Sequence, residues 1–145
     1  APDPQAEILQ ESELVWIGAP AGVAWRQRPL PLAFETGCIF RPWVQKALDM
    51  AEIPWVMAVD SFSIRTVDAS ISADIAVHAA ISFTVQRRYE VIDHGGALPQ
   101  LPPIKVAMYV AEGPRNPLAQ KLGEVVRQKW GDGLSGHDPM SLAAE

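Results

Sequence analysis

Two short segments of the sequence have the residue types of a small-molecule binding site. They are Glu35-Thr36-Gly37-Cys38 and Asp60-Ser61-Phe62-Ser63, and each stands between an apolar run and a stretch with helical spacing. At such a turn, hydroxyl groups and the unpaired N–H groups of the first helical residues can bind a ligand, and the helix N-terminus favours a carboxylate or a similar anion. The candidate ligand-binding residues from the two segments are Thr36, Gly37, Cys38, Ser61, Phe62 and Ser63.

The elements that position these segments are strands and helices in alternation. Apolar runs predict strands at 30–34, 55–59 and 75–81, and apolar residues at helical spacing predict helices at 39–50 and 64–72. The run at 55–59 is uninterrupted, which is typical of a strand covered on both faces. This order predicts an α/β fold with a parallel-rich open sheet and flanking helices, in which ligands bind beyond the carboxyl ends of the strands.

Further elements are expected on either side of this central part. They are a strand at 14–17, a short helix at 83–88, a turn at 93–96, a strand at 104–110 and a helix at 116–131. Residues 1–13 are polar and contain proline, and they are expected to form an N-terminal extension. Residues 132–145 are expected to be a flexible tail.

His78 is a further candidate for ligand binding, because it falls toward the far end of the expected strand 75–81, beside the two segments. An imidazole with apolar neighbours is also typical of a protein interior, and the sequence leaves both roles open. Asp93 and His94 form a turn and do not have a recognised metal-ligand spacing. No metal and no cofactor are therefore expected.

A catalytic role for Cys38 is the alternative from a different class of function. A cysteine at a helix start can act as a nucleophile when a general base stands beside it, and His78 and His94 are the available bases. The protein would then be a small α/β enzyme. The competing explanation for Cys38 is a small buried side chain, which is common for cysteine.

Composition restricts the class of protein. The 145 residues are 48% apolar and carry a net charge of −5 with no cluster of Lys or Arg, which argues against a nucleic-acid-binding surface on this chain. The single cysteine excludes an internal disulfide and suits a reducing cytosol. No membrane-spanning run and no signal peptide are recognised, so the expected location is the cytoplasm, and a periplasmic solute-binding protein is disfavoured.

The order of these segments resembles the effector-binding domain of LysR-type transcriptional regulators. The resemblance runs from about residue 14 to residue 130, and its most specific parts are Gly-Cys-Ile-Phe-Arg at 37–41 and Leu-Pro-Gln-Leu-Pro at 98–102, the latter followed by a strand and a final helix. The sequence departs from the family at 72–77, where the family usually has a glycine-rich entry to the strand.

This resemblance implies a periplasmic-binding-protein type II-like fold and a sensory function. Family members have a winged helix-turn-helix that binds DNA, a linker helix, and two α/β subdomains that bind a small effector between them. On this basis the chain would be mostly the second regulatory subdomain, at 14–103, with the strand and helix at 104–131 returning to the first subdomain. Its expected partners are a small anionic metabolite, further copies of the chain, and DNA only through the winged helix-turn-helix, which this sequence does not contain.

The returning strand and helix predict self-association. In a regulator of this kind the segments 104–110 and 116–131 would pack on the first subdomain, so here their apolar faces and strand edges are expected to bind another copy. Light scattering at micromolar concentration should therefore give a dimer or a larger oligomer. A compact monomer would contradict the assignment of 104–131 to a second subdomain.

Overall fold

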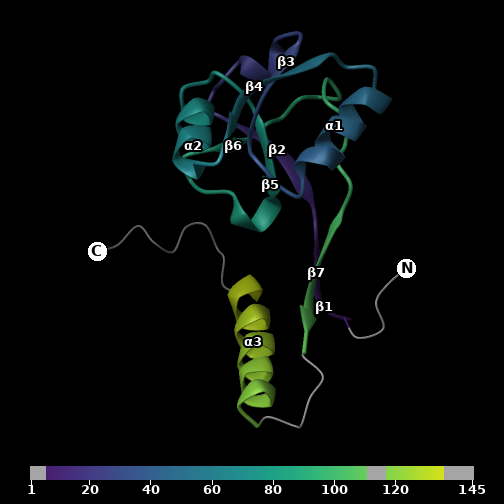
Figure 1. Ribbon diagram of the computed structural model, residues 1–145, viewed down its shortest axis with the longest axis vertical. Helices are drawn as coiled ribbons and strands as arrows, with labels where there is room; N and C mark the ends of the chain where they lie inside the picture. The colour runs from purple at the N-terminus through teal and green to yellow at the C-terminus, as the bar shows by residue number, and fades with distance from the viewer. Residues whose placement is uncertain (1–5, 111–116, 136–145) are drawn as a thin grey trace. The chain divides into compact units, whose positions relative to one another are not determined.

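Two compact units make up the chain (Figure 1). The computed structural model describes residues 6–110 and 117–135, with the backbone alone for 132–135. The larger unit is Ser12–Ile104, and the smaller unit combines Ala1–Glu11 with Lys105–Glu145.

A parallel strand pair is the centre of the larger unit. β3 (Leu30–Glu35) and β4 (Trp55–Ser61) are parallel, and α1 (Arg41–Met50) provides the crossover that a parallel connection needs. α2 (Ile64–Ser72) follows β4. These four elements confirm the predicted strand-then-helix order, and both strands therefore end at the same edge of the sheet.

The other strands of this unit pair in the opposite sense. β5 (His78–Ile81) and β6 (Glu90–Val91) each pair antiparallel with β2 (Leu14–Gly18). A parallel bridge between Leu32 and Val77 joins this group to β3. The α/β class is confirmed, and the sheet is mixed, since its parallel part is limited to β3, β4 and the bridge.

Three details of the sequence prediction are wrong in this unit. β5 begins at His78, because the preceding residues reach β3 only through the single bridge at Val77. The helix expected at 83–88 is only a 3-10 turn, η2 (Ser82–Thr84). β4 is not covered on both faces, because it is an edge strand whose residues alternate between half-buried and exposed, with Val56 47% exposed.

The core of the larger unit has two clusters, one between the strands and α1 and a smaller one between Ala33 of β3 and α2. Its largest fully buried side chains are Phe34, Leu30, Leu32, Leu48, Ile71, Val44 and Val77. The segment after β6 closes one side of this core with Leu98 and Leu101. Trp16 fastens that segment, since its Nε1–H donates to the carbonyl of Pro99 at 2.9 Å.

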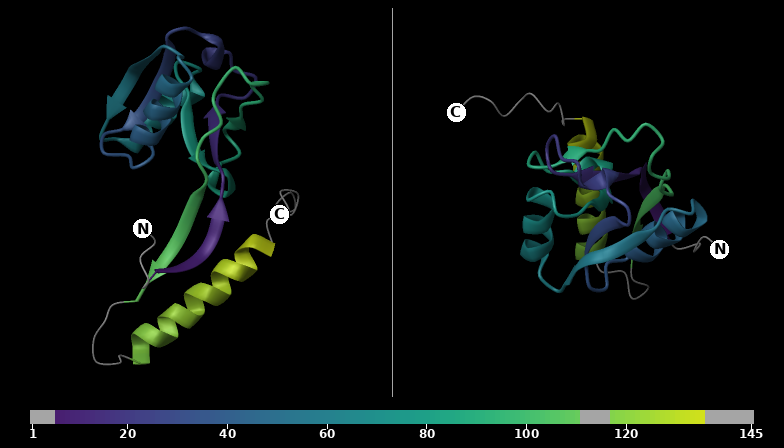
Figure 2. Two further views of the ribbon diagram at one scale, coloured as in Figure 1. Left: turned by 90° about the vertical axis from the view of Figure 1, so that its right-hand side faces the viewer. Right: turned by 90° about the horizontal axis from the view of Figure 1, so that it is seen from above.

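The described residues of the smaller unit form a strand pair and a long helix. β1 (Ala6–Ser12) pairs with β7 (Ile104–Tyr109), and Figure 2 shows that the two strands run in opposite directions. α3 (Pro117–Ser135) is held to β1 by Arg127, whose Nε donates to both carboxylate oxygens of Glu7 at 2.7 and 2.8 Å. This ion pair is exposed, so its contribution to stability is small.

Both ends of the chain differ from the sequence prediction. The polar segment 1–13 contains a strand, β1, which pairs with β7; its residues are half-buried or exposed, so no apolar run marks it in the sequence. α3 continues to Ser135, four residues beyond the predicted end, and the rest of the predicted tail lies outside the described residues. Leu118, Leu122 and Val125 on α3 are exposed, and the binding of another copy at this helix stays a prediction.

A close backbone approach in the loop between β2 and β3 gives a stability prediction. This loop contains a 3-10 turn, η1 (Ala24–Arg26), and the Asp74 carboxylate accepts the N–H groups of Val23 and Ala24 at 2.8 and 3.0 Å. A Cβ on Gly22 would lie 2.5 Å from Asp74 Oδ1 and 2.8 Å from the carbonyl oxygen of Ala19. Gly22→Ala should therefore lower the free energy of unfolding by about 1–3 kcal/mol, measured by urea denaturation.

The matched control is Gly131→Ala in α3. A Cβ at Gly131 meets no atom within 4 Å, and alanine is the better helix former, so this variant should be neutral or stabilised by up to about 1 kcal/mol. Equal stability of the two variants would contradict the close approach at Gly22.

Candidate functional site

The turns that follow β3 and β4 lie side by side in the larger unit. Glu35 is in register with Ser61 at the ends of the two strands, and the N–H of Thr36 donates to the carbonyl of Ser61 at 2.9 Å. Gly37 has a φ of +84°, a conformation that side chains resist, and it turns the chain toward α1. The structure thus brings six of the candidate residues to one edge: Thr36, Gly37, Cys38, Ser61, Phe62 and Ser63.

Several backbone donors at this edge are used within the chain. Besides Thr36, Cys38 donates its N–H to the carbonyl of Glu35 at 3.1 Å. The N–H of Ser63 donates to Ser61 Oγ at 3.1 Å. Of the other three residues, Ser61 belongs to β4, which is paired with β3, and Gly37 and Phe62 carry the remaining two backbone N–H groups. The edge therefore has fewer donors for a ligand than the sequence alone suggested.

A carboxylate that the sequence analysis did not select lies in the middle of this edge. Asp60 Oδ1 accepts the Thr36 hydroxyl at 2.6 Å, and Arg41 NH1 lies 3.0 Å from Asp60 Oδ2. The hydrogen bond from Thr36 and then that from Arg41 hold the pKa of Asp60 below its usual value. Asp60 is therefore ionised at neutral pH, and Arg41 balances its charge. The sequence feature that could have identified Asp60 is its position at the end of the predicted strand, directly before Ser61.

The start of α2 combines hydroxyl groups with exposed apolar side chains. Ser63 is the N-cap residue and has an extended backbone, but its side chain makes no capping hydrogen bond. Phe62 is 90% exposed, and Ile64 and Ile39 are exposed beside the two turns. Chemically, this arrangement can hydrogen-bond a polar group and cover an adjoining apolar or aromatic part of the same ligand.

His78 lies away from this edge. Its Nδ1–H donates to the carbonyl of Ala33 at 2.7 Å, two residues before the end of β3, and its ring centroid is 4.5 Å from that of Phe34. Burial lowers the pKa of His78, so the imidazole is neutral at physiological pH. Of the two roles that the sequence left open, this geometry is that of an interior imidazole.

The alternative chemistry of Cys38 has no support from its surroundings. Its side chain is partly buried against the core, and no hydrogen bond joins it to a histidine within residues 6–110 and 117–131. His94 uses its Nδ1 to accept the N–H groups of Gly96 and Leu98 at 3.1 and 3.3 Å.

The described residues form neither a metal-binding cluster nor a membrane-spanning helix. In the described part of the chain, His, Cys, Asp and Glu nowhere gather in threes to hold a metal ion. None of the described helices has the length and apolar character needed to cross a membrane.

Neither a protein-family model nor a curated protein matches the sequence. Solved structures do match. The full-length hypochlorite-specific LysR-type regulator HypT from Salmonella typhimurium has a TM-score of 0.66 and 15% identity, over 88% of this chain and 46% of that one. DarR from Vibrio fischeri, in complex with DNA, has a TM-score of 0.63 and 11% identity, over 85% and 44%. The regulatory domain of CcmR from Synechocystis PCC6803, in complex with 2-PG, has a TM-score of 0.59 and 12% identity, over 88% and 69%.

These matches identify the fold. The chain has the α/β architecture of the regulatory domains of LysR-type regulators, which is periplasmic-binding-protein type II-like, and this confirms the resemblance that the sequence suggested. The chain spans about half the length of the HypT and DarR chains that it matches, at 46% and 44%. At identities of 11–15% the likeness is one of fold, and the function is argued from the site.

The hydrogen bond between Thr36 and Asp60 predicts a pH effect. Because folding lowers the pKa of Asp60, the group stabilises the folded state at pH values above its unfolded pKa, and this contribution is lost as the pH falls through the folded pKa. Thr36→Val should raise the pKa of Asp60 in an NMR titration of the carboxyl carbon, and should weaken the pH dependence of stability at the acid end.

The control for this titration is Thr84→Val. The Thr84 hydroxyl donates to the carbonyl of Ile81 instead of a carboxylate, so the pKa of Asp60 should not move. An unchanged pKa of Asp60 in Thr36→Val would show that Arg41 alone governs this carboxylate.

Proposed function

We propose that this chain is the effector-sensing regulatory portion of a LysR-family transcriptional regulator and that it catalyses no reaction. The observation that carries the proposal is the pairing of Glu35 with Ser61, which brings two helix-starting turns to one edge of a fold shared with LysR-type regulatory domains. In open α/β sheets, ligands bind where helices begin beyond the carboxyl ends of strands.

The proposed effector is a small anionic metabolite. Its negative group would lie at the starts of α1 and α2, hydrogen-bonded by the N–H groups of Gly37 and Phe62 and by the hydroxyls of Ser61 and Ser63. The Asp60 carboxylate would not repel it strongly, because Arg41 lies 3.0 Å from that carboxylate and balances its charge. An apolar part of the effector would contact the exposed ring of Phe62.

The proposed output is a change in how an oligomer holds DNA. An effector shifts a conformational equilibrium only when it binds one arrangement more tightly than the other. Here the effector would favour one arrangement of the regulatory subdomains in a cytoplasmic homo-oligomer. DNA would be bound through a winged helix-turn-helix outside this sequence. The structure of DarR, which matches this fold and is in complex with DNA, supports this part of the proposal.

Titration with a panel of small carboxylates, followed by tryptophan fluorescence, tests this site. The double variant Ser61→Ala/Ser63→Ala removes the two hydroxyls proposed to bind the effector and should weaken effector binding by about tenfold or more, since a hydrogen bond to a charged group contributes about 1.5–3 kcal/mol. The primary amide of the same effector should bind more weakly than the carboxylate.

Thr84→Val is the control here as well, because Thr84 carries an exposed hydroxyl outside the edge. Unchanged affinity in the double variant would remove the effector site from this edge. Equal affinity for the carboxylate and its amide would retain the site and reject an anionic effector.

A further inference from the structure

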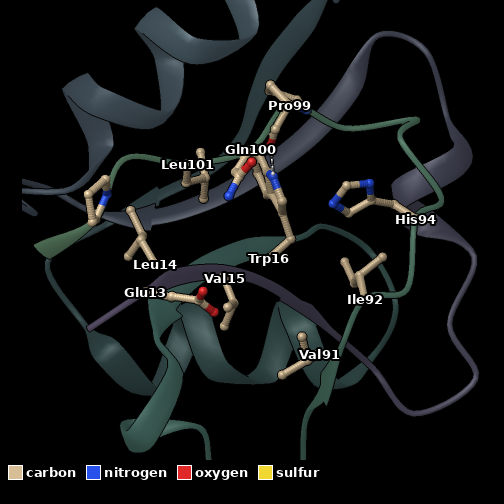
Figure 3. A pocket seen from close by; sticks show the side chains of 11 residues that line it. Glu13, Leu14, Val15, Trp16, Val91, Ile92, His94, Pro99, Gln100 and Leu101 are labelled. Carbon is tan, nitrogen blue, oxygen red and sulfur yellow. Dashed lines mark hydrogen bonds between the residues drawn. The ribbon is translucent and has the colours of Figure 1, made fainter. Parts of the chain in front are cut away.

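A second candidate site lies in the larger unit, away from the edge described above. A cavity of about 390 Å³ opens between β2 and the segment 91–103 (Figure 3). Its walls come from residues 13–16 on one side and from the segment after β6 on the other, namely Val91, Ile92, His94, Pro99, Gln100, Leu101 and Pro103. None of the six edge residues and no residue of α1 or α2 lines it. Its volume is in the range of small-ligand pockets.

The backbone of β2 presents hydrogen-bonding groups to this cavity. Within an antiparallel sheet, the N–H and C=O of one residue point to the same side of the strand, and successive residues alternate. The carbonyl of Glu13 accepts the N–H of Ser82, on the side of β5. The carbonyl of Trp16 accepts the N–H of Ile92, on the other side. The N–H and C=O of Leu14 therefore face the same side as those of Trp16, toward the cavity.

The segment 91–103, on the other side of the cavity, forms no strand pair with Leu14. β6 pairs only with Ile17 and Gly18, and the chain then leaves the edge of β2. The returning segment contains Pro99, Pro102 and Pro103, which have no N–H to donate. Among residues 6–110 we find no backbone hydrogen bond to Leu14 on this side.

Leu14 is therefore a cavity-lining residue whose backbone N–H and C=O lack partners on this side among the described residues. Leu14 is only 4% exposed, and buried backbone N–H and C=O groups are nearly always paired in folded proteins. A molecule in the cavity that offers one C=O and one N–H with strand spacing would pair both groups. The unit that has this spacing is a single extended amino-acid residue between two amide groups.

The cavity walls suit an apolar side chain on such a ligand. Trp16 and Leu101 are buried and line the cavity, and the Trp16 indole is fixed by its hydrogen bond to Pro99 at 2.9 Å. His94 accepts two N–H groups at Nδ1, so its Nε2 carries the proton and is a donor. The carboxylate of Glu13, which lines the cavity next to Val15, disfavours a negatively charged ligand (Figure 3).

We propose that this cavity binds a short, extended peptide or peptide-like amide with an apolar side chain and no negative charge. The ligand adds one residue of strand to the open edge of β2 at Leu14. This proposal is independent of the effector site, because the two sites share no residue and differ in the charge they favour.

The test uses a minimal probe, N-acetyl-leucine-N′-methylamide, titrated into the 145-residue protein and followed by NMR. The Leu14 backbone N–H and the Trp16 indole N–H should shift in a saturable manner. The same probe with its leucine nitrogen methylated lacks the donor for the Leu14 carbonyl, and it should bind at least tenfold more weakly. N-acetyl-leucine, which carries a carboxylate, should also bind more weakly.

A pair of matched variants tests the location. Gln100 is exposed and lines the cavity, so Gln100→Trp adds a large side chain there and should weaken binding of the probe at least tenfold. Gln86→Trp, also at an exposed glutamine but outside the cavity, should not. The proposal is overturned if no saturable shift occurs at millimolar probe, if the methylated probe binds equally well, or if Gln86→Trp weakens binding as much as Gln100→Trp.

Discussion

The parallel pairing of β3 with β4 is the interaction on which the candidate site depends. Parallel strands need a crossover, so α1 must begin where β3 ends, and α2 begins where β4 ends. A register shift between Leu32 and Ala33 adjusts the pairing so that Glu35 finishes opposite Ser61. Because side chains alternate along a strand, a slip of one residue would reverse which groups face the core. The position of both turns therefore follows from this register.

Polar side chains hold the end of β3 both at the exposed edge of the sheet and in the protein interior. Outside, Asp60 joins the first turn to the start of α1 through Thr36 and Arg41, at 2.6 and 3.0 Å. Inside, the neutral imidazole of His78 ties β5 to β3 at the carbonyl of Ala33. A neutral histidine is suited to the interior, where a charge would cost free energy, and an ion pair is suited to the edge, where water solvates it. Both contacts hold the end of β3 in one position.

The sequence predicted the elements whose signal is local. The strands at 30–34 and 55–59 and the helix at 64–72 have clear apolar periods, and the meeting of the two turns follows from the general geometry of parallel strands. An uninterrupted apolar run does not reveal whether one face of a strand meets water, which is why β4 was expected to be buried. The place of Asp60 depends on register, and β1 depends on a partner about a hundred residues away, so neither has a local signal.

The prolines at 99, 102 and 103 have a consequence for the behaviour of the folded chain in concentrated solution. An open strand edge is a template on which another chain can add a strand, and repeated addition leads to aggregation. The proline segment lies beside the open part of β2 and is fastened by Trp16 and by Arg28, which donates to the carbonyl of Ala97 at 3.0 Å. A long strand from another molecule would have to displace this segment, whereas a molecule the size of one residue would not. The proline segment thus hinders the addition of a whole strand from another molecule to β2, while the edge of β2 at Leu14 stays open to a small molecule in the cavity.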